Sequence, residues 1–310
     1  MTRHILITGA SGFVGRQVVA AARAVPGVRL RLMEHRASLD GAGAGSGAEI
    51  VRGDLESGES LRGMCDGVDA VIHCASRING DEQTTRTVND LGTRALVDEA
   101  VRAGVGRTVY LSTAAVYGRG PFTALVPGRA PLAPGSPTSV TRAAAENHVL
   151  AAGGTVLRPH LVYGEGDRWV IPGLVTLLRK LSAGPTGCPA RHSMIDVRVL
   201  GRALLSAALS PAETAGVHHV NHPDPVTSSD LIETAAIELG LPRPIADVGL
   251  DTARARLADF PRALHYLQLL TVEHWFADDR VWQLLDCDPG DGFTKDFPRH
   301  ADWYRGFLTS

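Results

Sequence analysis

The chain has 310 residues and a formal net charge of −2, with 44% hydrophobic and 21% charged residues, as in a globular protein of one large domain or two unequal lobes. The near-neutral charge argues against nucleic acid or an anionic membrane as a partner, and no apolar run is long enough to span a bilayer. The first residues read as a strand rather than a signal peptide, and the four cysteines lack metal-like spacing. We therefore expect a cytoplasmic protein with reduced thiols and no metal.

A glycine-rich turn follows the first predicted strand, 4–7, and precedes a helical pattern over 16–22. Gly9 allows the tight turn, Gly12 lets a pyrophosphate approach the backbone, and Gly15 lets the helix lie close to the sheet. The helix N-terminus then offers free N–H groups to the phosphates. This order predicts a dinucleotide site, for which the turn supplies Gly9, Ser11, Gly12, Phe13, Val14 and Gly15.

The second predicted strand, 28–33, ends where a dinucleotide's adenosine ribose usually lies. An acid there accepts hydrogen bonds from a free 2′-hydroxyl, whereas a base pairs with a 2′-phosphate. The sequence offers Glu34 and then His35 and Arg36. We favour NADP(H) over NAD(H) through Arg36, the alternative being that Arg36 is a solvated loop residue.

Further strands are predicted over 50–55, 69–76 and 108–113, with a surface loop over 40–47 and an amphipathic helix from 88 to about 103. Five prolines between 119 and 137 exclude a continuous helix or a central strand, so this segment should be a loop bordering the pocket. The candidate site residues at or near the ends of these elements are Asp54, Leu55, Cys74, Ala75, Ser76, Asn89 and Thr113.

The glycine turn and these strand-end motifs resemble the extended, epimerase/dehydratase type of short-chain dehydrogenase/reductase over nearly the whole chain. The resemblance implies an α/β fold, a Rossmann doubly wound parallel sheet with a smaller C-terminal substrate lobe. The nucleotide domain would be 1–164 plus 191–222, and the lobe 165–190 plus 223–310.

The same resemblance suggests roles for single residues. Asp54 would accept a hydrogen bond from the adenine amino group, and the backbone at 74–76 would pass under the cofactor. Asn89 would shape the active-site side of its helix, although an Asn that caps backbone groups near a helix start fits equally well. Thr113 would be the catalytic hydroxyl, and substrate contacts would come from Thr113, Ala114, Tyr117 and Tyr163.

The signature pair of that family, Tyr-x-x-x-Lys, is absent. Twenty-five residues after Thr113, where the Tyr is expected, stands Thr138, and Arg142 replaces the Lys. An aliphatic hydroxyl is far too weak an acid or base to replace the phenol near neutral pH. Arg142 stays protonated, so it can hold ribose hydroxyls and favour negative charge but is a poor proton source.

The segment 155–164 resembles the family's sixth strand, which would place Pro159 and His160 beside the nicotinamide. Two roles are open to His160 there, a proton source or a packed histidine. Segment 191–197 would return to the nucleotide domain, followed by a helix over 198–210 and a strand over 216–221. Helices over 228–239 and 251–269 and several aromatic residues would build the lobe.

Three functions compete. The first is an NAD(P)H-dependent ketoreductase, the second a nucleotide-sugar epimerase or dehydratase, and the third a non-catalytic nucleotide-binding sensor. The second begins by oxidising an alcohol, for which Thr138 cannot be the base. The missing acid favours a ketone flanked by phenol or enol hydroxyls, which stabilises its own alkoxide.

Only Lys180 and Lys295 are lysines among the 31 basic residues, which indicates a GC-rich genome such as an actinobacterium's. The chain is similar to atypical short-chain reductases that tailor aromatic polyketides such as angucyclinones in those bacteria. The expected partner is thus a small aromatic ketone, and the oligomeric state stays open.

Overall fold

The computed structural model describes residues 2–36, 39, 47–181, 184–185, 189–241, 247–278 and 280–309. Nearly all of the predicted loop 40–47 lies outside the described residues, as does Cys188. Among the described helices, none is long and apolar enough to cross a membrane.

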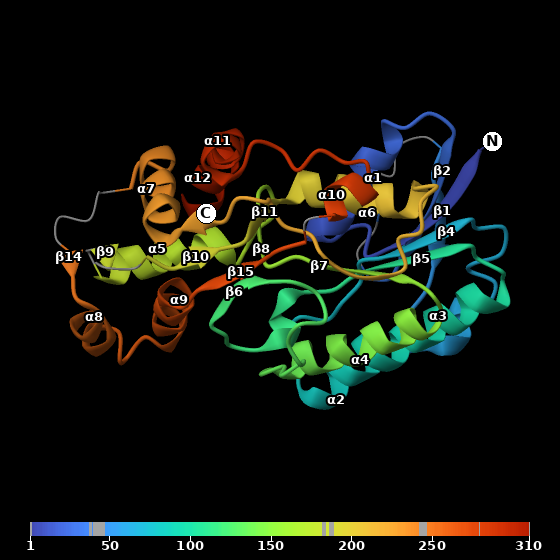
Figure 1. Cartoon of the computed structure of the whole chain (residues 1–310). Helices are drawn as coiled ribbons and strands as arrows, with labels where there is room; N and C mark the ends of the chain where they lie inside the picture. The colour runs from blue at the N-terminus through green and yellow to red at the C-terminus, as the bar shows by residue number, and fades with distance from the viewer. Residues whose placement is uncertain are drawn as a thin grey trace.

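A seven-stranded, fully parallel sheet forms one half of the molecule (Figure 1). Its order, β12-β7-β5-β4-β1-β2-β3, reverses direction between β1 and β4, which is the doubly wound arrangement predicted from the sequence. Its strands are β1 (Arg3–Thr8), β2 (Val28–Glu34), β3 (Glu49–Arg52), β4 (Ala70–His73), β5 (Arg107–Leu111), β7 (Thr155–Arg158) and β12 (Gly216–His219).

Helices cover both faces of this sheet (Figure 1). On one face α1 (Phe13–Arg23) packs on α6 (Val197–Leu209), and their apolar sides share a core with β1, β2 and β4. On the other face lie α2 (Glu82–Thr85), α3 (Gly92–Arg102) and α4 (Pro137–Ala151). Shorter helical turns are η1 (Gly58–Leu61), η2 (Arg86–Leu91), η3 (Ala114–Tyr117), η4 (Phe297–His300) and α10 (Val281–Leu284).

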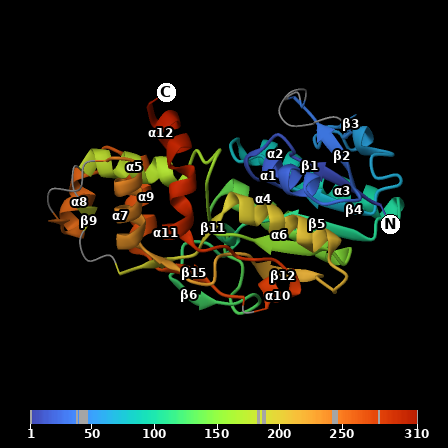
Figure 2. The ribbon, with the colours of Figure 1, turned by 90° about the horizontal axis from the view of Figure 1, so that it is seen from above.

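The second half is a smaller lobe with its own apolar core (Figure 2). Its helices are α5 (Val170–Leu181), α7 (Ser228–Glu238), α8 (Leu250–Arg256), α9 (Pro261–Thr271), α11 (Phe293–Asp296) and α12 (Ala301–Thr309). A four-stranded sheet joins β13 (Val226–Thr227), β10 (Arg191–His192), β15 (His274–Phe276) and β6 (Phe122–Leu125). Two strand pairs complete it, β8 (Leu161–Tyr163) with β11 (Met194–Asp196) and β9 (Gly184–Pro185) with β14 (Asp247–Val248).

The predicted fold class, a Rossmann sheet with a smaller C-terminal lobe, is confirmed, but several predicted elements are wrong in detail. The proline-rich segment contains β6, which pairs through one neighbour, β15, and so is an edge strand. The predicted helix 251–269 is broken into α8 and α9, because Pro261 opens a new helix. Helix 88–103 begins earlier, at Glu82, and Asn89 lies within the π-helical turn η2.

The division into 1–164 plus 191–222 and 165–190 plus 223–310 stays a prediction. Two segments cross it. Strand β6 belongs to the sheet of the lobe, and Val281 and Leu285 of the α10 region pack into the core around α1 and α6. Figure 2 shows α10 lying beside β12, on the Rossmann side of the molecule.

A buried ion pair joins α4 to β7. Arg158 donates from Nε and Nη2 to the two carboxylate oxygens of Glu146, and the side chains are 6% and 1% exposed. Ser112 donates to the same carboxylate, and Arg158 Nη1 donates to the Tyr117 hydroxyl at 2.7 Å. Each charge is therefore balanced by hydrogen bonds rather than by water.

Glu146→Gln should destabilise the fold by about 3 kcal/mol, because it leaves the buried Arg158 guanidinium without a counter-charge. Urea unfolding followed by circular dichroism measures the change. Asp251→Asn is the control, since its carboxylate pairs with Arg254 at the surface, where loss of an ion pair costs less than about 1 kcal/mol. Equal effects of the two substitutions would contradict the importance of the buried pair.

Candidate cofactor and active site

The turn between β1 and α1 depends on its glycines. Gly9 has φ +69°, and a Cβ there would lie 2.6 Å from the Ala75 nitrogen. A Cβ at Gly15 would lie 2.0 Å from the Gly9 carbonyl oxygen. Helix α1 has no side-chain cap at Gly12, so its first N–H groups remain available to an anion.

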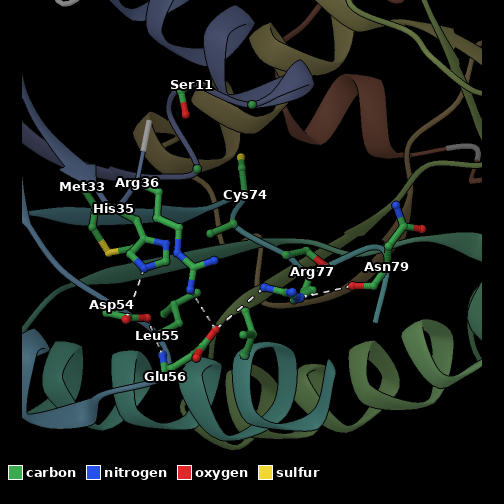
Figure 3. A pocket seen from close by; sticks show the side chains of 15 residues that line it. Ser11, Met33, His35, Arg36, Asp54, Leu55, Glu56, Cys74, Arg77 and Asn79 are labelled. Carbon is green, nitrogen blue, oxygen red and sulfur yellow. Dashed lines mark hydrogen bonds and ion pairs between the residues drawn. The ribbon is translucent and has the colours of Figure 1, made fainter. Parts of the chain in front are cut away.

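A cavity of about 540 Å³ opens beside this turn (Figure 3). It lies against the residues that follow β1, β2 and β4, at the point where the strand order reverses, which is where open α/β sheets bind ligands. The predicted cofactor residues that line it are Gly9, Ser11, Gly12, His35, Arg36, Asp54, Leu55, Cys74, Ala75 and Ser76.

Charged side chains gather at the far end of the cavity from the glycine turn (Figure 3). His35 Nε2 lies 3.2 Å from Asp54 Oδ2, and Arg36 and Arg77 each lie 3.8 Å from the Glu56 carboxylate. The Arg36 side chain is 70% exposed, so it is free to turn toward a ligand.

Glu34 does not line the cavity. Its Oε2 accepts from the Leu39 backbone N–H at 2.8 Å, and its Oε1 lies 3.7 Å from Arg52. Glu34 is thus hydrogen-bonded within its own loop, whereas Arg36 lines the cavity.

Sequence reasoning missed five lining residues. Arg77 and Asn79 follow the recognised 74–76 segment, and the sequence signal for them was their position next to it. Glu56 likewise follows Leu55, whereas Met33 and Val88 carry no signal beyond being apolar.

Asn89 and His73 support the cavity wall from behind. The Asn89 amide oxygen accepts from Ser76 Oγ and Arg77 N, and its nitrogen donates to the Arg77 carbonyl and to Thr141 on α4, so the side chain ties the chain at 76–77 to α4. His73 is bonded by Thr8 and Thr93, and burial lowers its pKa to about 3. Both residues position backbone that lines the cavity, and direct cofactor contact by Asn89 is not supported by its place.

The three predicted catalytic residues come from two elements. Thr113 Oγ1 accepts from the Ala115 N–H at 3.2 Å, which leaves its own hydroxyl hydrogen for another acceptor. The Thr138 hydroxyl instead donates to the Ile78 carbonyl at 2.9 Å. Arg142 donates from Nη2 to the Leu111 carbonyl, and its buried Nε has no hydrogen-bond partner among the described residues.

The substrate contacts predicted for Tyr117 and Tyr163 need correction. The Tyr117 side chain is buried, and its hydroxyl bonds to Arg158 and His219 inside the protein. Tyr163 is 1% exposed and packs on Phe293 in the lobe core. Burial raises the pKa of both phenols, so neither is a ready proton donor. Ala114 is buried too, and its N–H donates to the Pro159 carbonyl.

His160 follows this Pro159 segment. Its backbone N–H donates to Asn221, and its ring stacks on His274 with centroids 5.5 Å apart. Burial, and then the neighbouring His274 and His192, lower its pKa well below the ordinary value. A neutral ring of this kind is packed rather than positioned as an acid, which favours the packed-histidine alternative.

These features define a dinucleotide-binding α/β protein. The residues present fit the cofactor, because Gly9, Gly12 and Gly15 allow a tight turn that a Cβ at Gly9 or Gly15 would disrupt, and the helix end and Arg142 Nε offer unused donors. Residues 5–221 match the NAD dependent epimerase/dehydratase family, and the chain belongs to that family. It is an NAD(P)-dependent enzyme of the extended short-chain dehydrogenase/reductase type acting on a small molecule.

Two characterised proteins show how wide this family's chemistry is. The chain is 27% identical over 304 residues to the 2-alkyl-3-oxoalkanoate reductase of Stenotrophomonas maltophilia, covering 88% of this chain and 91% of the relative. It is also 27% identical over 318 residues to the dTDP-glucose 4,6-dehydratase of Streptomyces antibioticus, covering 90% and 94%.

The fold has solved counterparts. A short-chain dehydrogenase/reductase superfamily protein from Agrobacterium tumefaciens, solved with bound NAD, superposes with a TM-score of 0.77 at 24% identity, covering 99% of this chain and 98% of that one. At this identity the likeness concerns the fold.

Gly12→Val should lower affinity for either dinucleotide at least about a hundredfold, because the side chain would occupy the space of the pyrophosphate. Calorimetric titration with NADPH and NADH measures this. Gly306→Val is the matched control, since a Cβ at that exposed glycine meets no atom within 4 Å. Unchanged affinity in Gly12→Val would place the dinucleotide elsewhere.

Proposed function

We propose that this protein is an NADPH-dependent ketoreductase that reduces a ketone on a hydroxylated polycyclic aromatic substrate, of the polyketide type. The observation that carries the proposal is the place of the family's missing acid. Thr138 stands there, its hydroxyl hydrogen donated to the Ile78 carbonyl, and Arg142 is a permanent cation. Neither residue supplies a proton readily, so we infer that a hydroxyl of the substrate stabilises and protonates the alkoxide.

The shape of the lobe supports an apolar substrate. A cavity of about 520 Å³ lies there, with a wall built mainly from Leu161, Leu174, Leu231 and Leu269 together with Trp169 and Tyr266. Leu161, one of its wall residues, directly follows His160 in the chain. Among the described residues of its wall, Arg262 is the one permanent cation, which suits an aromatic ring system better than a nucleotide pyrophosphate.

Two features support NADPH over NADH. Arg36 faces the cavity at the end of β2, where a 2′-phosphate would lie, with Arg77 close by. Glu34, the acid that would accept the hydroxyls of an unphosphorylated ribose, already accepts from Leu39.

The mechanism we infer assigns each residue one task. NADPH, when bound, supplies the hydride. Thr113 donates its free hydroxyl hydrogen to the carbonyl oxygen as negative charge develops there. Arg142 holds the ribose and adds a fixed positive charge near the site. A phenol or enol hydroxyl next to the ketone stabilises the alkoxide and passes a proton to it, and the Thr138 hydroxyl keeps the chain at Ile78 in place.

The similarity to a reductase of 2-alkyl-3-oxoalkanoates supports ketone reduction, and the similarity to a dTDP-glucose dehydratase supports the second reading. Turnover assays distinguish them. With NADPH the purified protein should reduce a hydroxylated polycyclic aromatic ketone. Conversion of a nucleotide sugar would favour the dehydratase, and binding without turnover across both substrate classes would favour the sensor.

Arg36→Ala should weaken NADPH binding about tenfold or more and leave NADH binding nearly unchanged, because only the former loses a charge-assisted contact to phosphate. Calorimetry with both cofactors measures the difference. Arg52→Ala is the control, being a 90% exposed arginine at the end of the next strand. Equal losses for the two cofactors would remove Arg36 from its assigned role.

The source of the proton is tested by comparing changes in enzyme and substrate at saturating cofactor. Thr138→Val should lose less than about tenfold in kcat, since it removes no acid, whereas Thr113→Val should lose roughly a hundredfold. Methylating the substrate hydroxyl beside the ketone should be the most damaging change. Binding of the methylated substrate is measured separately. If His160→Gln abolishes turnover while both ligands still bind, the enzyme supplies the acid and the self-protonating substrate is excluded.

A further inference from the structure

Three histidine rings from distant parts of the chain meet where the two halves of the molecule join. His160 follows β7, His192 ends β10 and His274 begins β15, and one ring nitrogen of each lies within 4.8 Å of the other two. In the parallel pairing of β10 and β15, His192 is the direct partner of His274. Figure 1 shows these two strands beside β6, between the lobes.

Hydrogen bonds fix which nitrogen carries the proton in two of the rings. His274 Nδ1 lies 2.9 Å from the Val272 carbonyl oxygen, which only accepts. Nδ1 is therefore protonated and Nε2 has the free lone pair in the neutral ring.

The argument for His192 runs through Ser228. The Ser228 hydroxyl donates to the Leu270 carbonyl at 2.6 Å, so its oxygen accepts from His192 Nε2–H at 2.9 Å. His192 Nδ1 then has the lone pair.

Two ring nitrogens of the cluster have no described hydrogen-bond partner. His192 Nδ1 and His160 Nε2 are both buried without a hydrogen bond among the described residues, and such groups call for an explanation in a folded protein. Gly120 keeps the third one open, because a Cβ there would lie 2.9 Å from His274 Nε2.

We propose that His160, His192 and His274 bind a divalent transition-metal ion, with Zn²⁺ the best fit. Three imidazoles without a carboxylate suit Zn²⁺, which takes such sets with a fourth position open. The carbonyl and hydroxyl behind His274 and His192 are the partners that ligating histidines use to hold their orientation. His160 is the partly exposed member of the three as a residue, although its Nε2 is buried.

The distances allow this with little movement. The centre of a triangle with sides of 4.8 Å is about 2.8 Å from each corner, and Zn–N bonds are about 2.0–2.1 Å. Each nitrogen would move inward by less than about 0.8 Å, and the His160 ring, which stacks on His274, would also turn so that its lone pair meets the ion. Arg191 donates to Glu273 at 2.7 Å, so an ion pair next to two of the ligands already holds β10 against β15.

The test uses the full chain after chelator treatment and dialysis, titrated with Zn²⁺ and, separately, with Co²⁺. The wild type should take up one Zn²⁺ per chain by elemental analysis, raise its melting temperature on binding, and give the visible absorption bands of low-symmetry Co²⁺. His160→Gln should weaken binding at least about tenfold, and Ser228→Ala, which keeps all three ligands, about 10–100-fold.

His222→Gln is the matched control, since this histidine lies outside the cluster and bonds to Asp224. Circular dichroism establishes that each variant is folded. Equal metal uptake by His160→Gln and the wild type would assign the metal to other surface groups and overturn the proposal. A wild type that binds no Zn²⁺, or a water molecule at the centre of the cluster in crystals grown with Zn²⁺, would overturn it as well.

Discussion

The buried pair of Glu146 and Arg158 is the interaction on which the arrangement of the site depends. Its members sit one turn beyond Arg142 on α4 and directly before Pro159 at the end of β7, and the carboxylate also accepts from Ser112, the residue before Thr113. Arg158 in turn holds Tyr117 in place. The charges are far from water, so their mutual satisfaction fixes three chain segments at once.

Much of the nucleotide half could be predicted from the sequence, because its signals are local. The glycine turn and the strand-end residues Asp54 and Cys74 each have a physical cause within a few residues. The exception was helix 88–103, since Asp81 caps a start upstream of the apolar pattern. The small lobe was less predictable because its strands are two to four residues long and pair across the chain.

The functional residues also differ in how well local sequence signals predict their roles. Tyr117 and Tyr163 lie in motifs that mark a site by sequence, yet burial gives them internal bonds and packing. For the three clustered histidines the opposite holds, because the sequence does not group them and the structure brings them together. They are 32 and 82 residues apart along the chain, so no spacing rule connects them, and only the pairing of β10 with β15 brings them together.

Strand β6 and the α10 region tie the two halves of the molecule together mechanically. β6 leaves the nucleotide half to pair with β15, and Val281 and Leu285 return from the lobe to the core beside α1. A hinge between two lobes needs few segments that cross from one to the other. Here β6 crosses in one direction and the α10 region crosses in the other. Swinging the lobe as a rigid body would pull Val281 and Leu285 out of the core beside α1 and expose them. A rigid swing of the lobe is thus disfavoured, and we expect movement around the lobe cavity to come from local segments such as the half-exposed Trp169 that lines it.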